Sequence, residues 1–106
     1  MTIPANDPPA VDDTAASRFV IREDGAEAEL VYVVEGDRFV LVHTAVPEEW
    51  GGRGIGSRLV RAALARAEAN ALTVVPWCPF ARRWLHDHPA EAAAVKIDWD
   101  PPPLPL

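Results

Sequence analysis

The segment between residues 51 and 56 reads Gly-Gly-Arg-Gly-Ile-Gly, four glycines in six residues. A β-type pattern ends just before it, and an apolar helical period begins at Ile55 and continues to about Asn70. A plain strand-to-helix connection needs fewer glycines, whereas a backbone that approaches a phosphate closely needs several. Backbone N–H groups at the start of a helix also attract anions. The segment therefore predicts a phosphate-binding loop, with a plain β–α connection as the alternative.

Three extended segments precede this loop: residues 18–22, 27–35 and 38–46. Asp-Gly and Gly-Asp turn signals separate them, which predicts an antiparallel meander. After the helix, residues 72–75 predict a short buried strand, Pro79 predicts the start of a second helix, and residues 90–95 predict a last short helix. The predicted fold class is α/β (α+β), with a mixed, mostly antiparallel sheet.

A length of 106 residues fits one domain. We expect this domain over residues 17–99, because the composition changes at both ends. Residues 1–16 are rich in proline and aspartate and are expected to form a disordered tail, and residues 100–106 are expected to form a proline-rich tail.

The formal net charge of −6 disfavours sequence-independent binding to nucleic acid or to an anionic membrane and favours a cationic partner. The sequence has no secretory leader pattern and no run of about 18 apolar residues. The single cysteine, Cys78, excludes an intramolecular disulfide, so we expect a cytoplasmic protein. His86 and His88 point to different faces of a helix, and no metal site is expected.

Two common phosphate loops do not fit the glycine spacing. A P-loop requires a lysine before Ser57, where this chain has Gly56. A dinucleotide fingerprint requires Gly-x-Gly-x-x-Gly, but Ser57 and Leu59 stand at the third glycine position in the two possible registers. Both readings are therefore rejected.

The loop instead resembles the acetyl-CoA pyrophosphate loop of the general control non-repressible N-acetyltransferase (GNAT) superfamily, whose pattern is Gln/Arg-x-x-Gly-x-Gly/Ala. The resemblance covers roughly residues 18–95, and the segment Cys78-Pro79-Phe80 is similar to one in the short, single-domain branch of that superfamily. It implies a minimal GNAT fold with an acetyl-CoA-binding helix. It also implies an N-acetyltransferase that moves acetyl from acetyl-CoA to an amine of a small molecule, a peptide or a protein lysine.

The resemblance further implies cofactor contacts from the end of the third strand, the loop and the start of the second helix: Ala45, Val46, Gly51, Gly52, Arg53, Gly54, Ile55, Gly56, Ser57, Pro79 and Phe80. Backbone N–H groups near Ala45 and Val46 would bind the pantetheine arm and the thioester carbonyl. Gly51 departs from the family pattern, which has Gln or Arg there, and Arg53 is expected to compensate.

Acetyl transfer requires a base that takes a proton from the amine. The candidates are His43, Glu48 and Glu49, since imidazole titrates near neutral pH and both carboxylates lie one loop further on. Counting by alternation places His43 on the same face as Phe39 and Leu41, so a packed or capping histidine is an equal alternative. Solvated loop carboxylates are the alternative for the two glutamates.

The reaction also requires an acid for the departing thiolate. Many GNAT enzymes use a tyrosine after the last core strand, but the only tyrosine here, Tyr32, lies in the second strand. Cys78 remains as a candidate, because the N-cap position before Pro79 favours a thiolate through the helix dipole. It would then relay a proton or form a transient acyl-thioester; a small buried apolar residue is the alternative.

Two rival functions stay open at this point. The missing tyrosine favours a non-catalytic acyl-CoA-binding module, and Trp50, Trp77 and the proline-rich end, if exposed, favour an interaction domain. If the protein is an enzyme, Glu48 and Glu49 beside the loop favour a cationic amine as acceptor.

Overall fold

The computed structural model describes residues 9–102; the predictions for residues 1–8 and 103–106 lie outside this part of the chain. In chain order the elements are β1 (Val11–Asp13), β2 (Arg18–Glu23), β3 (Ala26–Glu35), β4 (Arg38–Ala45), the 3₁₀ turn η1 (Glu48–Trp50), α1 (Ile55–Asn70), β5 (Thr73–Pro76), α2 (Pro79–Asp87), α3 (Pro89–Ala92) and β6 (Lys96–Ile97). The strands of the described residues form one sheet in the order β1-β2-β3-β4-β5-β6.

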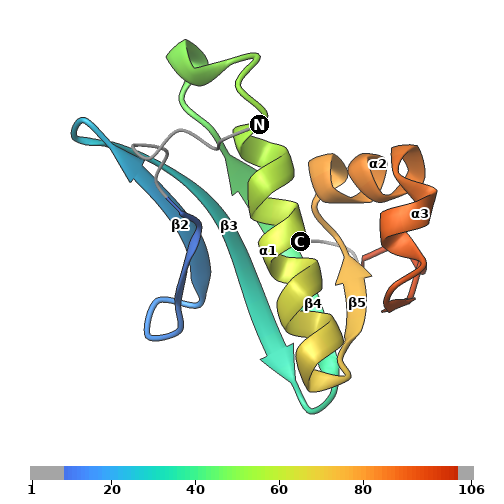
Figure 1. Ribbon diagram of the computed structural model, residues 1–106. Helices are drawn as coiled ribbons and strands as arrows, with labels where there is room; N and C mark the ends of the chain where they lie inside the picture. The colour runs from blue at the N-terminus through green and yellow to red at the C-terminus, as the bar shows by residue number, and fades with distance from the viewer. Residues whose placement is uncertain (1–8, 103–106) are drawn as a thin grey trace.

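The sheet is mixed and mostly antiparallel, as predicted. Strands β1 to β4 are antiparallel neighbours, and β5 joins β4 in parallel because α1 carries the chain back along the sheet. β6 adds a second parallel pair at the far edge. Figure 1 shows α1 crossing in front of the sheet, with α2 and α3 beside it and the turn η1 above the end of β4.

The core lies between the sheet and the helices. The apolar stripe predicted for α1 is buried, and it packs in one cluster with α2 and with the inner face of the strands. Phe39, Leu41 and Leu59 are fully enclosed in this cluster. Burying such side chains contributes about 1.5–3 kcal/mol each. The core therefore fixes the start of α1 against the ends of β4 and β5.

Strand β1 was not predicted, because residues 11–13 fall in the expected N-terminal tail. The strand pairs with β2, and a polar cluster attaches it to the core. The Tyr32 hydroxyl donates to Asp12, and Arg66 donates to both at 2.6 and 2.9 Å. Burial is the main cause that raises the pKa of Tyr32, and the hydrogen bond with Asp12 is the second, so this hydroxyl stays protonated. Because these partners are distant in sequence, the residues around β1 carry no local pattern that predicts the strand.

A β-bulge alters the end of β4. Leu41 and His43 pair with consecutive residues of β3, so Val42 is an extra residue in β4. An extra residue reverses the alternation of side chains, and Thr44 rather than His43 turns toward the core. The prediction that His43 shares a face with Phe39 and Leu41 is therefore wrong, and its side chain is exposed.

Beyond the bulge, β4 and β5 separate. Their parallel pairing ends at Leu41 and Pro76, and just after β5 the Cys78 N–H donates to the Leu41 carbonyl, at 2.8 Å. Residues 42–45 continue β4 while pairing only with β3. We call the opening between this end of β4 and the start of α2 the fork.

Candidate functional site

The glycine loop adopts the backbone conformation that its composition suggests. Gly52 and Gly54 have φ of +80° and +73°, in the left-handed region that side chains disfavour. A Cβ built on either glycine would have no atom within 4 Å, so the space beside the backbone is open. Gly54 is the N-cap of α1, and no side chain caps this helix. The N–H groups of the first turn are therefore available to an anion.

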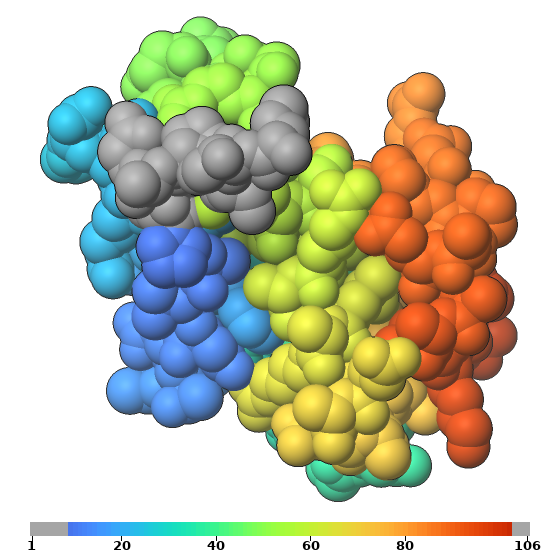
Figure 2. All heavy atoms as spheres, in the orientation of Figure 1, coloured from blue at the N-terminus to red at the C-terminus, as the bar shows by residue number. Residues whose placement is uncertain are grey.

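Beside the loop lies a surface pocket of about 270 Å³. It is lined by Val46, Trp50, Gly51, Gly52, Gly54, Ile55, Gly56, Ser57 and Phe80. All but Trp50 were predicted cofactor contacts. Ala45, Arg53 and Pro79 were predicted as well but do not line this pocket. Figure 2 shows the loop end of the molecule in green at the top.

Trp50 was missed as a lining residue, and the rival reading of an interaction domain required it to be exposed. Its side chain is only 7% exposed and belongs to the core cluster, so that prediction is wrong. Its position as the one apolar residue in a run of glutamates and glycines is the signal that a buried anchor was needed there. Trp50 therefore packs into the core and attaches the loop to it.

Gly56 is required for a different reason than Gly54. It lies inside α1, and a Cβ at this position would approach the Phe80 ring to 2.6 Å. Phe80 is nevertheless 43% exposed, since its outer side forms a wall of the pocket. The absence of a side chain at Gly56 therefore lets the first turn of α2 close onto the first turn of α1.

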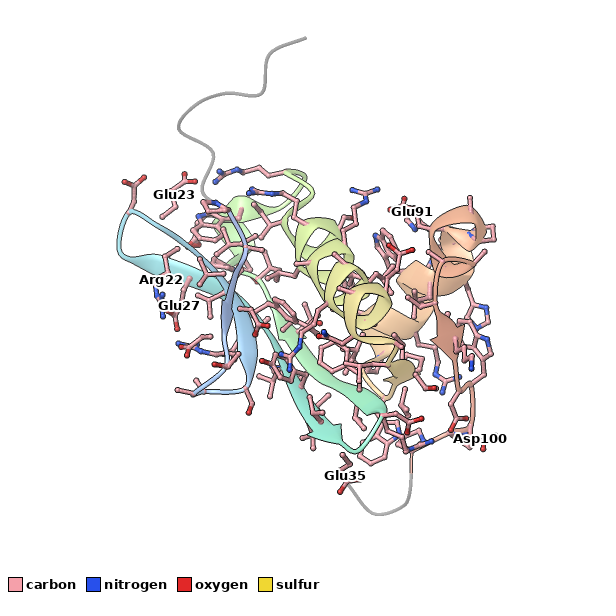
Figure 3. The ribbon with its side chains drawn as sticks, turned by 60° about the horizontal axis from the view of Figure 1, so that its bottom comes forward. Arg22, Glu23, Glu27, Glu35, Glu91 and Asp100 are labelled. Carbon is pink, nitrogen blue, oxygen red and sulfur yellow. The ribbon has the colours of Figure 1, made fainter. Side chains whose placement is uncertain are left out.

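Arg53 is held against the protein at the tip of the loop. Its guanidinium donates to Glu23 at 2.8 Å and lies 5.5 Å from the centre of the Trp50 ring. Figure 3 labels Glu23 at the end of β2, next to the loop. These contacts hold the Arg53 guanidinium in an ion pair with Glu23 at the tip of the loop, and Gly51 brings no side chain of its own.

Cys78 is the N-cap of α2, as predicted, but it does not cap the helix with its side chain. Its thiol is buried, because Cys78 is 2% exposed and lies in the core cluster. Its Sγ lies 3.2 Å from the Thr44 hydroxyl, which comes from the opposite side of the fork. The two side chains thus join β4 and α2 where the strands separate.

The candidate bases lie around the outer end of β4. His43 is exposed on the sheet face opposite the core, two residues before Ala45. Glu48 and Glu49 form the first two residues of η1 and are exposed as well. Among residues 9–102, none of the three side chains makes a hydrogen bond to another residue.

A family model described as GCN5-related N-acetyl-transferase matches residues 18–95. The chain belongs to this family. Protein NATD1 from Gallus gallus and from Homo sapiens is 32% identical over 80 residues, which cover 73% of this chain and 73% and 71% of the two relatives. The solution structure of a GCN5-like protein from Staphylococcus aureus superimposes with a TM-score of 0.64 at 29% identity, over 78% of this chain and 84% of that one. The fold is a compact GNAT fold.

The pocket suits the diphosphate group that GNAT proteins bind. The left-handed glycines leave open space where a side chain would stand, and an uncapped helix start faces it. Among residues 9–102 we find no group of three metal-ligating side chains, and no helix there is both long and apolar enough to cross a membrane.

Proposed function

We propose that the protein transfers acetyl from acetyl-CoA to an amine. The observation that carries this proposal is the position of the open glycine loop next to the fork. Val46 lines the pocket directly after β4, so a ligand on the loop has a short path to the fork. The thioester of acetyl-CoA would supply an activated carbonyl at that position.

The loop holds the diphosphate in this proposal, with its N–H groups and with the partial positive charge of the α1 N-terminus. Arg53 lies at the tip of the loop in an ion pair with Glu23, so its guanidinium is held there without adding net charge. The outer end of β4 has no β5 neighbour beyond Leu41. Its backbone N–H groups near Ala45 and Val46 would donate to the pantetheine arm and to the carbonyl oxygen.

The proton-transfer roles follow from exposure. His43, Glu48 and Glu49 are exposed near the end of β4, where a cationic amine can approach. Cys78, buried at the fork, is the candidate that would protonate the departing thiolate. A cytoplasmic setting remains part of the proposal, because a free thiol there stays reduced.

A non-catalytic acyl-CoA-binding module is the second candidate. The observation that favours it is the burial of Cys78, since a buried thiol reaches a substrate only if the fork admits one. Calorimetric titration with CoA and acetyl-CoA, followed by thiol release over an amine library, separates the possibilities. We expect both ligands to bind and cationic amines to accelerate thiol release. Binding without release would leave the binding module, and absence of binding would contradict both.

Two variants distinguish the residue that acts as the base from the residues that attract the acceptor. We expect His43→Gln to lower kcat about 100-fold with little change in the acceptor KM. Glu48→Lys with Glu49→Lys should instead raise the acceptor KM and remove the salt dependence of the rate, because exposed charges act by steering. If His43→Gln keeps wild-type kcat and the double reversal lowers kcat, a glutamate is the base.

A further inference from the structure

Ser57 lines the pocket in the first turn of α1. Among residues 9–102, its hydroxyl makes a hydrogen bond with one other side chain. The Nε1–H of Trp84 in α2 donates to the Ser57 Oγ at 2.8 Å. An indole N–H can only donate, so in this bond the serine oxygen accepts. The hydroxyl hydrogen of Ser57 is not used in that bond, and no other side-chain hydrogen bond of Ser57 occurs among residues 9–102.

Trp84 is held in a single orientation. It is 4% exposed, and its ring stacks on the His88 ring with centroids 3.9 Å apart and planes 12° apart. The Nδ1 of His88 lies 2.8 Å from the Trp84 carbonyl oxygen, which fixes the histidine in turn. The direction of the indole N–H is therefore set by α2 itself.

A second contact ties this indole to α1. The Arg61 guanidinium lies 5.3 Å from the centre of the Trp84 ring, and Glu91 of α3 accepts two hydrogen bonds from Arg61, at 2.7 and 3.1 Å. Figure 3 labels Glu91 on this side of the molecule. The arginine lowers the pKa of Glu91, so the pair stays charged. Trp84 of α2 thus contacts two residues of α1, Ser57 and Arg61, and Glu91 of α3 holds Arg61 in place.

We infer that Trp84 is a positioning residue that orients the Ser57 hydroxyl so that its hydrogen is available to the anion in the glycine-loop pocket. A serine hydroxyl without a partner rotates freely and both donates and accepts. The bond from Trp84 occupies one lone pair of the serine oxygen and restricts rotation of the hydroxyl, so its hydrogen stays available to a ligand. A phosphate oxygen offers only acceptors and suits this hydrogen, and the identity of the ligand depends on the proposed function.

The test is a double-mutant cycle on CoA affinity, measured by calorimetry. We expect Ser57→Ala to weaken CoA binding about tenfold, since a hydrogen bond to a charged group is lost. Trp84→Phe, which keeps a ring but removes the N–H, should weaken it about three- to tenfold. The double variant should bind like Ser57→Ala alone, because the tryptophan acts only through the serine. Ser57→Thr, which keeps a hydroxyl, should restore affinity close to that of the wild type.

Pantetheine, which lacks the diphosphate, is the ligand control. Its affinity should be the same in the wild type, Ser57→Ala and Trp84→Phe. The inference would be overturned if Trp84→Phe lowered CoA affinity by the same factor in the wild type and in Ser57→Ala. It would also be overturned if Trp84→Phe lowered the affinities for CoA and for pantetheine equally, since both results show a purely structural tryptophan. If the wild type binds no CoA at all, the proposed function fails instead.

NMR of the wild-type protein covers the case in which Trp84→Phe does not fold. Comparison with the spectrum of Ser57→Ala, which lacks the hydrogen bond, identifies the indole N–H signal of Trp84. In the wild type this N–H should exchange slowly with water, and its signal should shift when CoA is added. An indole signal that exchanges rapidly and does not respond to CoA would equally overturn the inference.

Discussion

Gly54→Val is expected to abolish the stabilisation of the fold by CoA. Gly54 has φ of +73° at the N-cap of α1, where a β-branched residue is disfavoured, and the new side chain would occupy the open space beside the loop backbone. The loss of one or two charge-assisted hydrogen bonds, at about 1.5–3 kcal/mol each, would weaken CoA binding about tenfold or more. Thermal unfolding with and without CoA measures this loss, since a bound ligand raises the midpoint.

Gly36→Val is the matched control for backbone strain. Gly36 also has a positive φ, +61°, with nothing within 4 Å of a built Cβ, but it lies in the turn between β3 and β4. Both variants should lose stability without ligand by about 1–2 kcal/mol. Only Gly54→Val should lose the response to CoA. Wild-type CoA affinity in a folded Gly54→Val protein would contradict the assignment of the phosphate site.

Much of this arrangement was predictable because its signals are local. The glycine cluster, the helical period from Ile55 and the proline before α2 each specify a neighbouring element, and the structure contains α1 over the predicted residues. The glycine loop lies beside the ends of β4 and β5, because the β–α–β connection brings the start of α1 there. The loop and α1 could therefore be placed from local signals, whereas the set of cofactor contacts came from the family resemblance and stays a prediction.

The errors concern features that depend on distant residues. One extra residue in β4 reversed the side of His43, and nothing in the run from Arg38 to Ala45 marks a bulge. Strand β1 depends on Arg66, which lies 54 residues away from Asp12. The hydrogen bond between Ser57 and Trp84 likewise joins two helices that no sequence period relates. Such contacts are specified by packing and become visible only in three dimensions.

Cys78→Ser is expected to lower kcat for acetyl transfer about 100- to 10,000-fold while CoA affinity stays unchanged. In our proposal the amine nitrogen attacks the acetyl carbonyl, the carbon–sulfur bond breaks, and the Cys78 thiol gives its proton to the departing thiolate. A serine hydroxyl of similar size can keep the contact with Thr44 but is a far weaker acid than a thiol. Steady-state thiol release gives kcat, and calorimetry gives the CoA affinity.

The same variant separates proton transfer from covalent catalysis at Cys78. If the thiol only gives a proton, mass spectrometry of the denatured protein after mixing with acetyl-CoA, without amine, should find no added acetyl group. If it forms an acyl-thioester, the wild type should gain one acetyl and Cys78→Ser should gain none. Because Cys78 is 2% exposed, either route requires the ligand to enter the fork beside Thr44. Wild-type kcat in a folded Cys78→Ser protein would therefore exclude both routes and leave Cys78 as a packing residue between β4 and α2.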